Sequence, residues 1–174
     1  GDADKIVARA RELRLSIEGV RIVDPATIDS AAYAALLHSR AGRAGVNPRD
    51  ALRGVRNDPT VLACLMLEQG EADAAICGAN GRFGHHLARV EGIIGLRPGV
   101  RSLATLSALV LPKGTFFIAD AYVNLDPTAE EIADLTELAA GTMLRMGVQP
   151  RAALVSHANF GDRPSASSRK MREA

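Results

Sequence analysis

The chain has 174 residues, enough for one sizeable hydrophobic core or for part of a larger two-lobed fold. Aromatic residues make up only 3% of it, so a core must be built from Ala, Leu, Val and Ile. The 21 Lys and Arg residues nearly balance the 20 Asp and Glu residues, which argues against a general nucleic-acid binder, and no apolar run reaches the roughly 18 residues of a membrane helix. We therefore expect a globular cytoplasmic protein, with neither nucleic acid nor a membrane as its partner.

The first half of the chain predicts helices with two short strands between them. Two helix starts share one device, an N-cap residue followed by proline, in Asn47-Pro48 and Asp58-Pro59. Helices are predicted over residues 4–15, 47–56, 60–69 and 84–94. A further predicted helix contains residues 33–37 and ends near Gly42 and Gly45. The predicted strands cover residues 20–23 and 72–77. The second strand is expected to be buried and to hold Cys77 in the core, with a loop at residues 78–81.

The second half predicts a hairpin followed by a long helix. Residues 102–111 and 115–119 form the expected hairpin around Pro112-Lys113-Gly114. A helix is expected over residues 128–146, then a buried strand at 151–156, a loop at 157–164 and a final helix. Alternating strands and helices predict an α/β layer fold.

Two polar residues near the predicted hairpin have no role in secondary structure. Asp126 is interpreted as the N-cap of the long helix, with Pro127 as its first residue. Asp120 and Asn124 are not explained in this way. Polar side chains at the ends of buried elements cost free energy unless something binds them, so these two are candidate site residues.

The loop at residues 78–81 is a candidate ligand loop because it follows a predicted strand and precedes a helix. Glycine lets backbone amides approach a phosphate, and the helix N-terminus favours negative charge. Asn80, Gly81 and Arg82 are the candidate contacts. A tight turn with solvated Arg and His side chains is the alternative. His85 and His86 point about 100° apart on a helix, so we expect no shared metal ion.

A second candidate loop follows the strand predicted at residues 151–156. It supplies Ser156, Asn159 and Gly161, and Lys170 lies in the next helix. These groups suit a phosphate or a carbonyl, whereas a helix start capped by Ser165 or Ser167 is the alternative. No catalytic triad, Cys/His dyad or carboxylate pair can be assigned, so the residues alone identify no catalytic group.

Several motifs, in order and at family spacing, give the chain a resemblance to the phosphate acetyltransferase (phosphotransacetylase) family. It is most similar to the phosphotransacetylase-like C-terminal domain of bacterial NADP-dependent hybrid malic enzymes. The matching segments are residues 22–25, 70–74, 93–99, 111–133, 156–161 and 170–172.

Details of the loops favour the malic-enzyme branch of this family. The Cys77-Gly78-x-x-Gly81-Arg82 loop stands where true phosphotransacetylases carry a His-Ser-Thr type loop. Two family arginines align with Ala41 and Ala88, and Arg89 is the neighbour of the second. The catalytic Ser/Arg/Asp group of the family aligns beyond the last residue of this chain. The resemblance therefore does not imply intact acetyl transfer.

The resemblance implies an incomplete three-layer α/β/α fold with two lobes, like those of isocitrate and isopropylmalate dehydrogenases. Residues 1–100 would form part of the first lobe and residues 101–174 part of the second, through which the protein would form a dimer or higher homo-oligomer. A first strand and helix and a C-terminal portion of the family fold are expected to be missing.

The resemblance also implies a regulatory function. Acetyl-CoA or a related acyl-CoA would bind as an allosteric inhibitor, while N-terminal malic-enzyme domains with NADP and a divalent metal would convert malate to pyruvate. No cofactor is expected in this chain. An active phosphate acetyltransferase and a purely structural dimerisation domain are the alternatives. The candidate ligand-binding residues are Asn80, Gly81, Arg82, Arg89, Asp120, Asn124, Ser156, Asn159, Gly161 and Lys170.

Overall fold

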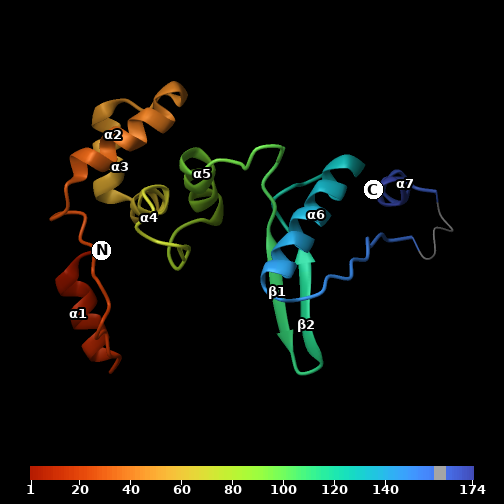
Figure 1. The fold of residues 1–174 in the computed structure, drawn as a ribbon, viewed down its shortest axis with the longest axis horizontal. Coiled ribbons are helices and arrows are strands. Elements are labelled where there is room, and N and C mark those ends of the chain that lie inside the picture. Colours follow the sequence, from red (N-terminus) through yellow and green to blue (C-terminus); the bar gives the residue numbers. More distant parts are fainter. Residues whose placement is uncertain (159–163) are drawn as a thin grey trace. The chain divides into compact units, whose positions relative to one another are not determined.

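The computed structural model describes residues 1–158 and 164–174, which form a mixed α/β structure. Seven α-helices, one 3₁₀-helix and one two-stranded sheet occur in these residues (Figure 1). The chain divides into two compact units, Gly1–Gly95 and Leu96–Ala174, and each is described by itself. Whether these units are the two predicted lobes stays a prediction. In the described ranges, no helix is both long and apolar enough to cross a membrane.

The first unit is helical. Its core gathers around Val55 and Leu65, whose side chains are fully enclosed. Small and branched apolar residues of α2, α3, α4 and α5 fill this core, as the shortage of aromatic residues requires. The helices are α1 (Ala3–Glu12), α2 (Ser30–Ala41), the 3₁₀-helix Gly42–Ala44, α3 (Pro48–Asn57), α4 (Pro59–Glu68) and α5 (Phe83–Ile93).

The predicted helix starts of α3 and α4 are confirmed. The Asn47 side chain accepts a hydrogen bond from the Asp50 amide at 2.9 Å, and the Asp58 carboxylate accepts one from the Thr60 amide at 3.1 Å. A proline follows each cap at the first helical position, where a missing N–H costs nothing. Gly45, at φ +93°, ends the 3₁₀-helix in the left-handed conformation.

The strands predicted at residues 20–23, 72–77 and 151–156 are absent from the structure. All three segments run without regular secondary structure. Ile76 is 101% exposed and Val155 is 80% exposed, and Cys77 is exposed, so its predicted place in the core is also wrong. Apolar composition favours a strand, but a strand also needs a neighbouring strand to pair its N–H and C=O groups. In the described residues only β1 and β2 form such a ladder.

The predicted hairpin is confirmed in the second unit. Strand β1 (Leu106–Leu111) pairs antiparallel with β2 (Gly114–Ala119), from Leu106 opposite Ala119 to Leu111 opposite Gly114. Two residues, Pro112 and Lys113, join the strands, and β1 begins later than the sequence predicts.

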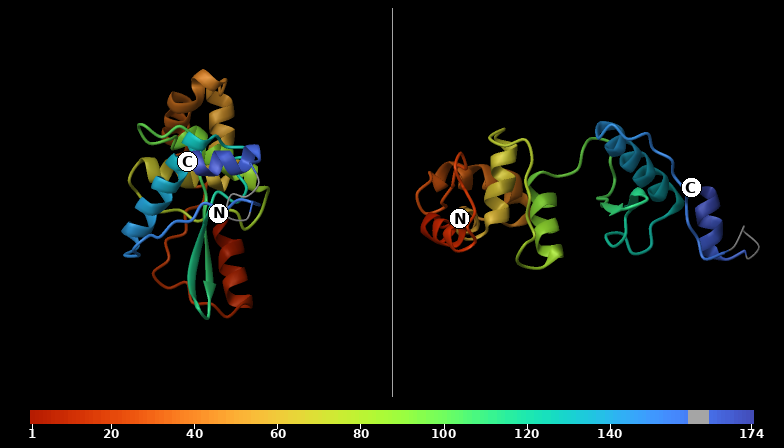
Figure 2. Two further views of the ribbon diagram at one scale, coloured as in Figure 1. Left: turned by 90° about the vertical axis from the view of Figure 1, so that its right-hand side faces the viewer. Right: turned by 90° about the horizontal axis from the view of Figure 1, so that it is seen from below.

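The helix α6 (Ala129–Arg145) lies against β2 in the second unit (Figure 2). Its N-cap is Thr128, so the predicted cap at Asp126 is wrong. The Thr128 hydroxyl accepts from the Glu131 amide at 3.2 Å, and the Glu131 carboxylate accepts from the Thr128 amide at 2.7 Å. This reciprocal capping box satisfies two amides, which one Asp side chain further upstream cannot do.

Two further contacts organise the second unit. Arg101 forms ion pairs with Glu130 at 2.6 Å and Asp134 at 2.7 Å, which fasten the segment before β1 to α6. The last helix, α7 (Ala166–Glu173), begins at Ser165, whose hydroxyl accepts from the Ser168 amide at 3.1 Å. Ser165 is therefore the cap of α7, one of the two caps that the sequence offered.

Candidate functional site

A cleft of about 960 Å³ lies within the first unit. One wall comes from residues 41–46, from α3 and from the first turn of α4. The other comes from residues 76–81 and from one face of α5. The loop that the sequence predicts as a ligand loop therefore does border a cleft, although no strand leads into it.

Asp58 joins the two walls of the cleft. One carboxylate oxygen, Oδ1, accepts from the Thr60 and Val61 amides at 3.1 and 3.4 Å. The other, Oδ2, accepts from His85 Nε2 and Arg89 Nε, each at 3.0 Å. Burial alone would raise the pKa of this carboxyl, but the hydrogen bonds from His85, Arg89 and the Val61 and Thr60 amides together outweigh burial and leave the pKa below its usual value. Asp58 is therefore a charged group in the folded protein at neutral pH.

His86 fixes the loop against α4. Its Nδ1 lies 2.8 Å from the Thr60 hydroxyl and its Nε2 lies 2.7 Å from the Asn80 carbonyl oxygen. A carbonyl only accepts, so Nε2 carries a proton, and the hydroxyl can donate to Nδ1. Gly81 follows at φ +99°, and a Cβ there would lie 3.0 Å from His86 Nε2. Only glycine fits this loop without a shift of the imidazole.

Three of the four site residues predicted in the first unit lie along the cleft. Asn80, Gly81 and Arg89 line it. Arg82 occupies the N-cap position of α5 without capping it and is not among the lining residues in the described part of the chain. Ala88 also lines the cleft, at the position where the family resemblance places an arginine in true phosphotransacetylases.

Asp120 and Asn124 hydrogen-bond to each other and to the main chain of the second unit. Asp120 has φ +48°, and its Oδ2 accepts from the Asn124 amide at 2.8 Å and from Asn124 Nδ2 at 2.7 Å. Asn124 Nδ2 also donates to the Leu103 carbonyl at 2.9 Å, and the Asp120 amide donates to the Thr105 carbonyl at 2.8 Å. The pair thus holds the end of β2 beside the segment before β1. Ligand binding by these residues stays a prediction.

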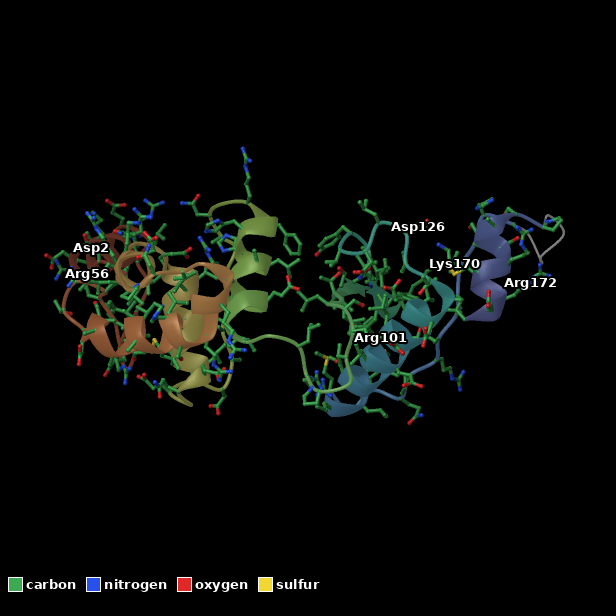
Figure 3. The ribbon with its side chains drawn as sticks, turned by 90° about the horizontal axis from the view of Figure 1, so that it is seen from above. Asp2, Arg56, Arg101, Asp126, Lys170 and Arg172 are labelled. Carbon is green, nitrogen blue, oxygen red and sulfur yellow. The ribbon has the colours of Figure 1, made fainter. Side chains whose placement is uncertain are left out.

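The remaining candidates belong to the C-terminal part of the second unit. The Ser156 hydroxyl accepts from the Ala158 amide at 3.3 Å. Lys170 forms an ion pair with Asp126, and Figure 3 shows the two side chains close together. No hydrogen bond joins Ser156 or Lys170 to Asp120 or Asn124 within residues 96–158 and 164–174. Asn159 and Gly161 lie outside the described residues.

Sequence reasoning missed the contribution of Asp58 and His85 to the cleft. The N-cap role is a sufficient explanation of Asp58 in the sequence, and His85 is interpreted there as a metal ligand, a base or a solvated side chain. The spacing of His85 and Arg89, four residues apart on α5, was the available signal, because it places both side chains on one helix face. Within the described residues, no group of three or more His, Cys, Asp and Glu could hold a metal ion.

The family of the chain follows from its sequence and fold. Residues 1–174 match the phosphate acetyl/butaryl transferase family over their whole length. The chain belongs to this family. It is also homologous to the C-terminal region of NADP-dependent malic enzymes.

The relatives fall into two groups. The chain is 47% identical to an NADP-dependent malic enzyme of Escherichia coli over 76% of its own length, and 50% identical to an NAD-dependent malic enzyme of Rhizobium meliloti over 76%. It is 30% identical to a phosphate acetyltransferase of Nitratidesulfovibrio vulgaris over 100%. The aligned regions span only 17% of each of these malic enzymes and 25% of that acetyltransferase.

A solved structure has the same fold. The EutD phosphotransacetylase from Staphylococcus aureus superposes with a TM-score of 0.81 at 23% identity. The match covers 99% of this chain and 52% of the other. At this level of identity the similarity concerns the fold alone.

Proposed function

We propose that this chain is a regulatory module of a malic enzyme, in which acetyl-CoA or a related acyl-CoA binds as an allosteric inhibitor. The observation that carries the proposal is the identity of 35–50% with five malic enzymes, against 29–31% with three phosphate acetyltransferases. In this proposal, N-terminal domains with NADP and a divalent metal oxidise and decarboxylate malate to pyruvate in the cytoplasm. This module responds to the acyl-CoA that forms from pyruvate.

The TM-score of 0.81 supports the finer fold assignment within this proposal. The two units would belong to the lobes of a three-layer α/β/α fold of the isocitrate and isopropylmalate dehydrogenase type, divided near residue 100. The second lobe would form a dimer or a higher homo-oligomer. In such an assembly an inhibitor bound to one module can act on several catalytic domains.

The cleft of the first unit supports binding of a large anionic ligand. Its volume of about 960 Å³ leaves room for part of a coenzyme, and Arg89 offers a planar set of N–H donors that suits phosphate. The helix α5 begins beside it, and the partial positive charge at the N-terminal end of a helix favours an anion there. Ala88 supports a binding role over a catalytic one, because its methyl group cannot stabilise the charge that develops in acyl transfer.

Inhibition requires only a modest coupling between this module and the catalytic domains. A coupling free energy of about 1–3 kcal/mol changes the affinity of the other site by roughly 5–150-fold. Such a value is enough for feedback control by a downstream product.

The test is calorimetry with acetyl-CoA on the full-length malic enzyme that carries this chain. We expect saturable binding, and loss of malate turnover at the same acetyl-CoA concentrations. Arg89→Ala should weaken both effects. Arg9→Ala is the matched control, because Arg9 lies on α1, pairs with Glu12 and does not line the cleft in the described part of the chain. Binding without inhibition, or oligomers that bind nothing, would contradict the proposal, and the second result would favour a structural dimerisation domain.

An active phosphate acetyltransferase is the second candidate. The observation in its favour is how much of the chain is aligned. Three phosphate acetyltransferases align with 99–100% of the chain, and five malic enzymes align with 75–82% of it. Release of free thiol from acetyl-CoA in the presence of phosphate measures this activity. Robust turnover would establish the second candidate, whereas binding without thiol release would support the first.

A further inference from the structure

We propose that Asp58 is a positioning residue of the cleft, whose carboxylate holds Arg89 in place to receive a phosphate group of the ligand. The inference rests on the proposed function only for the identity of that ligand, an acyl-CoA. Its structural basis is that the two carboxylate oxygens of Asp58 accept hydrogen bonds from two different helices. In the part of the chain that the structure describes, Oδ1 accepts hydrogen bonds only from the amides that begin α4, and Oδ2 accepts them only from the two side chains of α5.

The hydrogen bond from Arg89 to Asp58 leaves the two terminal nitrogens of the guanidinium available to a ligand. Asp58 engages Nε at 3.0 Å. Within residues 1–158 and 164–174, the two terminal nitrogens of Arg89 make no hydrogen bond, and the side chain, 46% exposed, lines the cleft. A guanidinium that is anchored at Nε presents its terminal N–H groups in a fixed direction. Fixed, paired donors of this kind suit the oxygens of a phosphate.

The anchor itself is well held. The Asp58 side chain is only 16% exposed, and four donors from α4 and α5 converge on it. A group with so many fixed partners cannot move aside when a ligand arrives. Asp58 therefore acts on the ligand through Arg89 and does not compete with the ligand for the terminal nitrogens of that side chain.

Charge alone gives the opposite expectation, which makes the inference testable. Asp50 and Arg53 in the cleft pair with each other at 2.9 Å, and Asp58 balances Arg89, so with neutral histidines these four groups sum to zero. Removal of the Asp58 charge makes the cleft more positive. If only net charge attracted the ligand, an anion would bind more tightly after this change. If Asp58 positions Arg89, the anion binds more weakly.

Asp58→Asn is the informative variant. Asn caps a helix as well as Asp does, so α4 keeps its start. The amide nitrogen, however, faces the donors of Arg89 or His85 and releases them. Asp29→Asn is the matched control, because Asp29 caps α2 through the Ala31 amide and does not line the cleft in the described part of the chain.

The experiment measures binding of inorganic phosphate and of acetyl-CoA to the full-length protein by calorimetry. We expect Asp58→Asn to weaken both ligands by about tenfold or more, and Asp29→Asn to leave both unchanged. Arg89→Lys keeps the charge but loses the Nε contact and should cause a similar loss. The double variant should be no weaker than either single variant, because Asp58 acts through Arg89.

Each outcome decides the matter. Unchanged or tighter binding to Asp58→Asn overturns the positioning role, as do additive losses in the double variant or a wild-type protein that binds neither probe. A wild type that binds phosphate but not acetyl-CoA overturns the proposed function, and the phosphate titrations then judge Asp58 alone. If Asp58→Asn fails to fold, the phosphate affinity of Arg89→Lys becomes the deciding measurement, and an unchanged affinity overturns the positioning role.

Discussion

The carboxyl of Asp58 also makes stability depend on pH. Its pKa in the folded protein is lowered, because burial is outweighed by the combined hydrogen bonds from His85, Arg89 and the Val61 and Thr60 amides. The unfolded value is about 3.9, so this contribution to the free energy of unfolding is complete above that pH and is lost as pH falls through the folded pKa. We expect urea denaturation to show a steeper loss of stability for wild type than for Asp58→Asn as pH falls below about 4. Parallel acid profiles would contradict this.

A second prediction at the residue scale concerns Gly81. Its φ of +99° and the 3.0 Å approach of a Cβ to His86 Nε2 both oppose a side chain. We expect Gly81→Ala to lower the free energy of unfolding by about 1–3 kcal/mol, by straining the backbone and breaking the bond to the Asn80 carbonyl.

Gly84 provides the control for this substitution. A Cβ there meets nothing within 4 Å, and the residue lies in α5. Gly84→Ala should be neutral, or stabilising by up to about 1 kcal/mol, because alanine favours a helix. Chemical denaturation of both variants is the measurement, and equal effects would show that the loop tolerates a side chain.

The sequence predicted some capping residues and not others, for a local reason. Asn47 and Asp58 each stand directly before a proline, and that dipeptide leaves few alternatives. Near α6, two candidates compete within three residues. Thr128 prevails over Asp126 because Glu131 completes a capping box with it, an interaction that requires both side chains at the correct spacing.

At the scale of elements, the helices follow from the sequence far better than the strands. A helix satisfies its amides within itself, so the apolar spacing and the caps of α4 define it. A strand depends on a partner elsewhere in the chain. Residues 72–77 have the composition of a buried strand but no neighbour to pair with, whereas β1 and β2 pair across a two-residue turn that the sequence contains.

The packing of the helices in the first unit depends on the buried side chains of α4. Leu65 is 0% exposed at the centre of the core. We expect Leu65→Ala to lower the free energy of unfolding by about 2–5 kcal/mol, because it removes buried methyl groups and leaves a cavity. The control is Leu13→Ala, since Leu13 follows α1 and is 52% exposed. Denaturant titrations of the two variants should differ clearly, and similar midpoints would place the core elsewhere.

At the scale of the whole molecule, only part of the cleft could be predicted from the sequence. Asn80 and Gly81 were recognised because a glycine loop before a helix is a local pattern, and Arg89 through the family resemblance. Asp58 and His85 meet across 27 residues, and only the packing of α4 against α5 brings them together. Such contacts cannot be inferred from spacing alone.

The apolar segments without partners lead to a prediction for hydrogen exchange. The chain spans about half of the solved phosphotransacetylase that it resembles. In the isolated 174-residue chain, we expect the amides of residues 73–77 and 151–155 to exchange quickly and those of β1 and β2 to be protected. In a full-length protein, pairing should slow exchange in the first two segments. Protection in the isolated chain would show pairing that the structure lacks.

The hydrogen bonds of His86 to Thr60 and to the Asn80 carbonyl have a consequence for how this cleft can evolve. These hydrogen bonds fasten α5 to α4 and also set the shape of the loop at residues 78–81. A substitution of Thr60 or His86 alters recognition and folding together, so few will be tolerated there, whereas Asn80 contributes only its main-chain carbonyl to these bonds. Ala79 lies in the loop, lines the cleft and makes no such bond in the described part of the chain, so it can vary at little cost. We expect ligand preference to diversify at that position while the hydrogen-bonded residues persist.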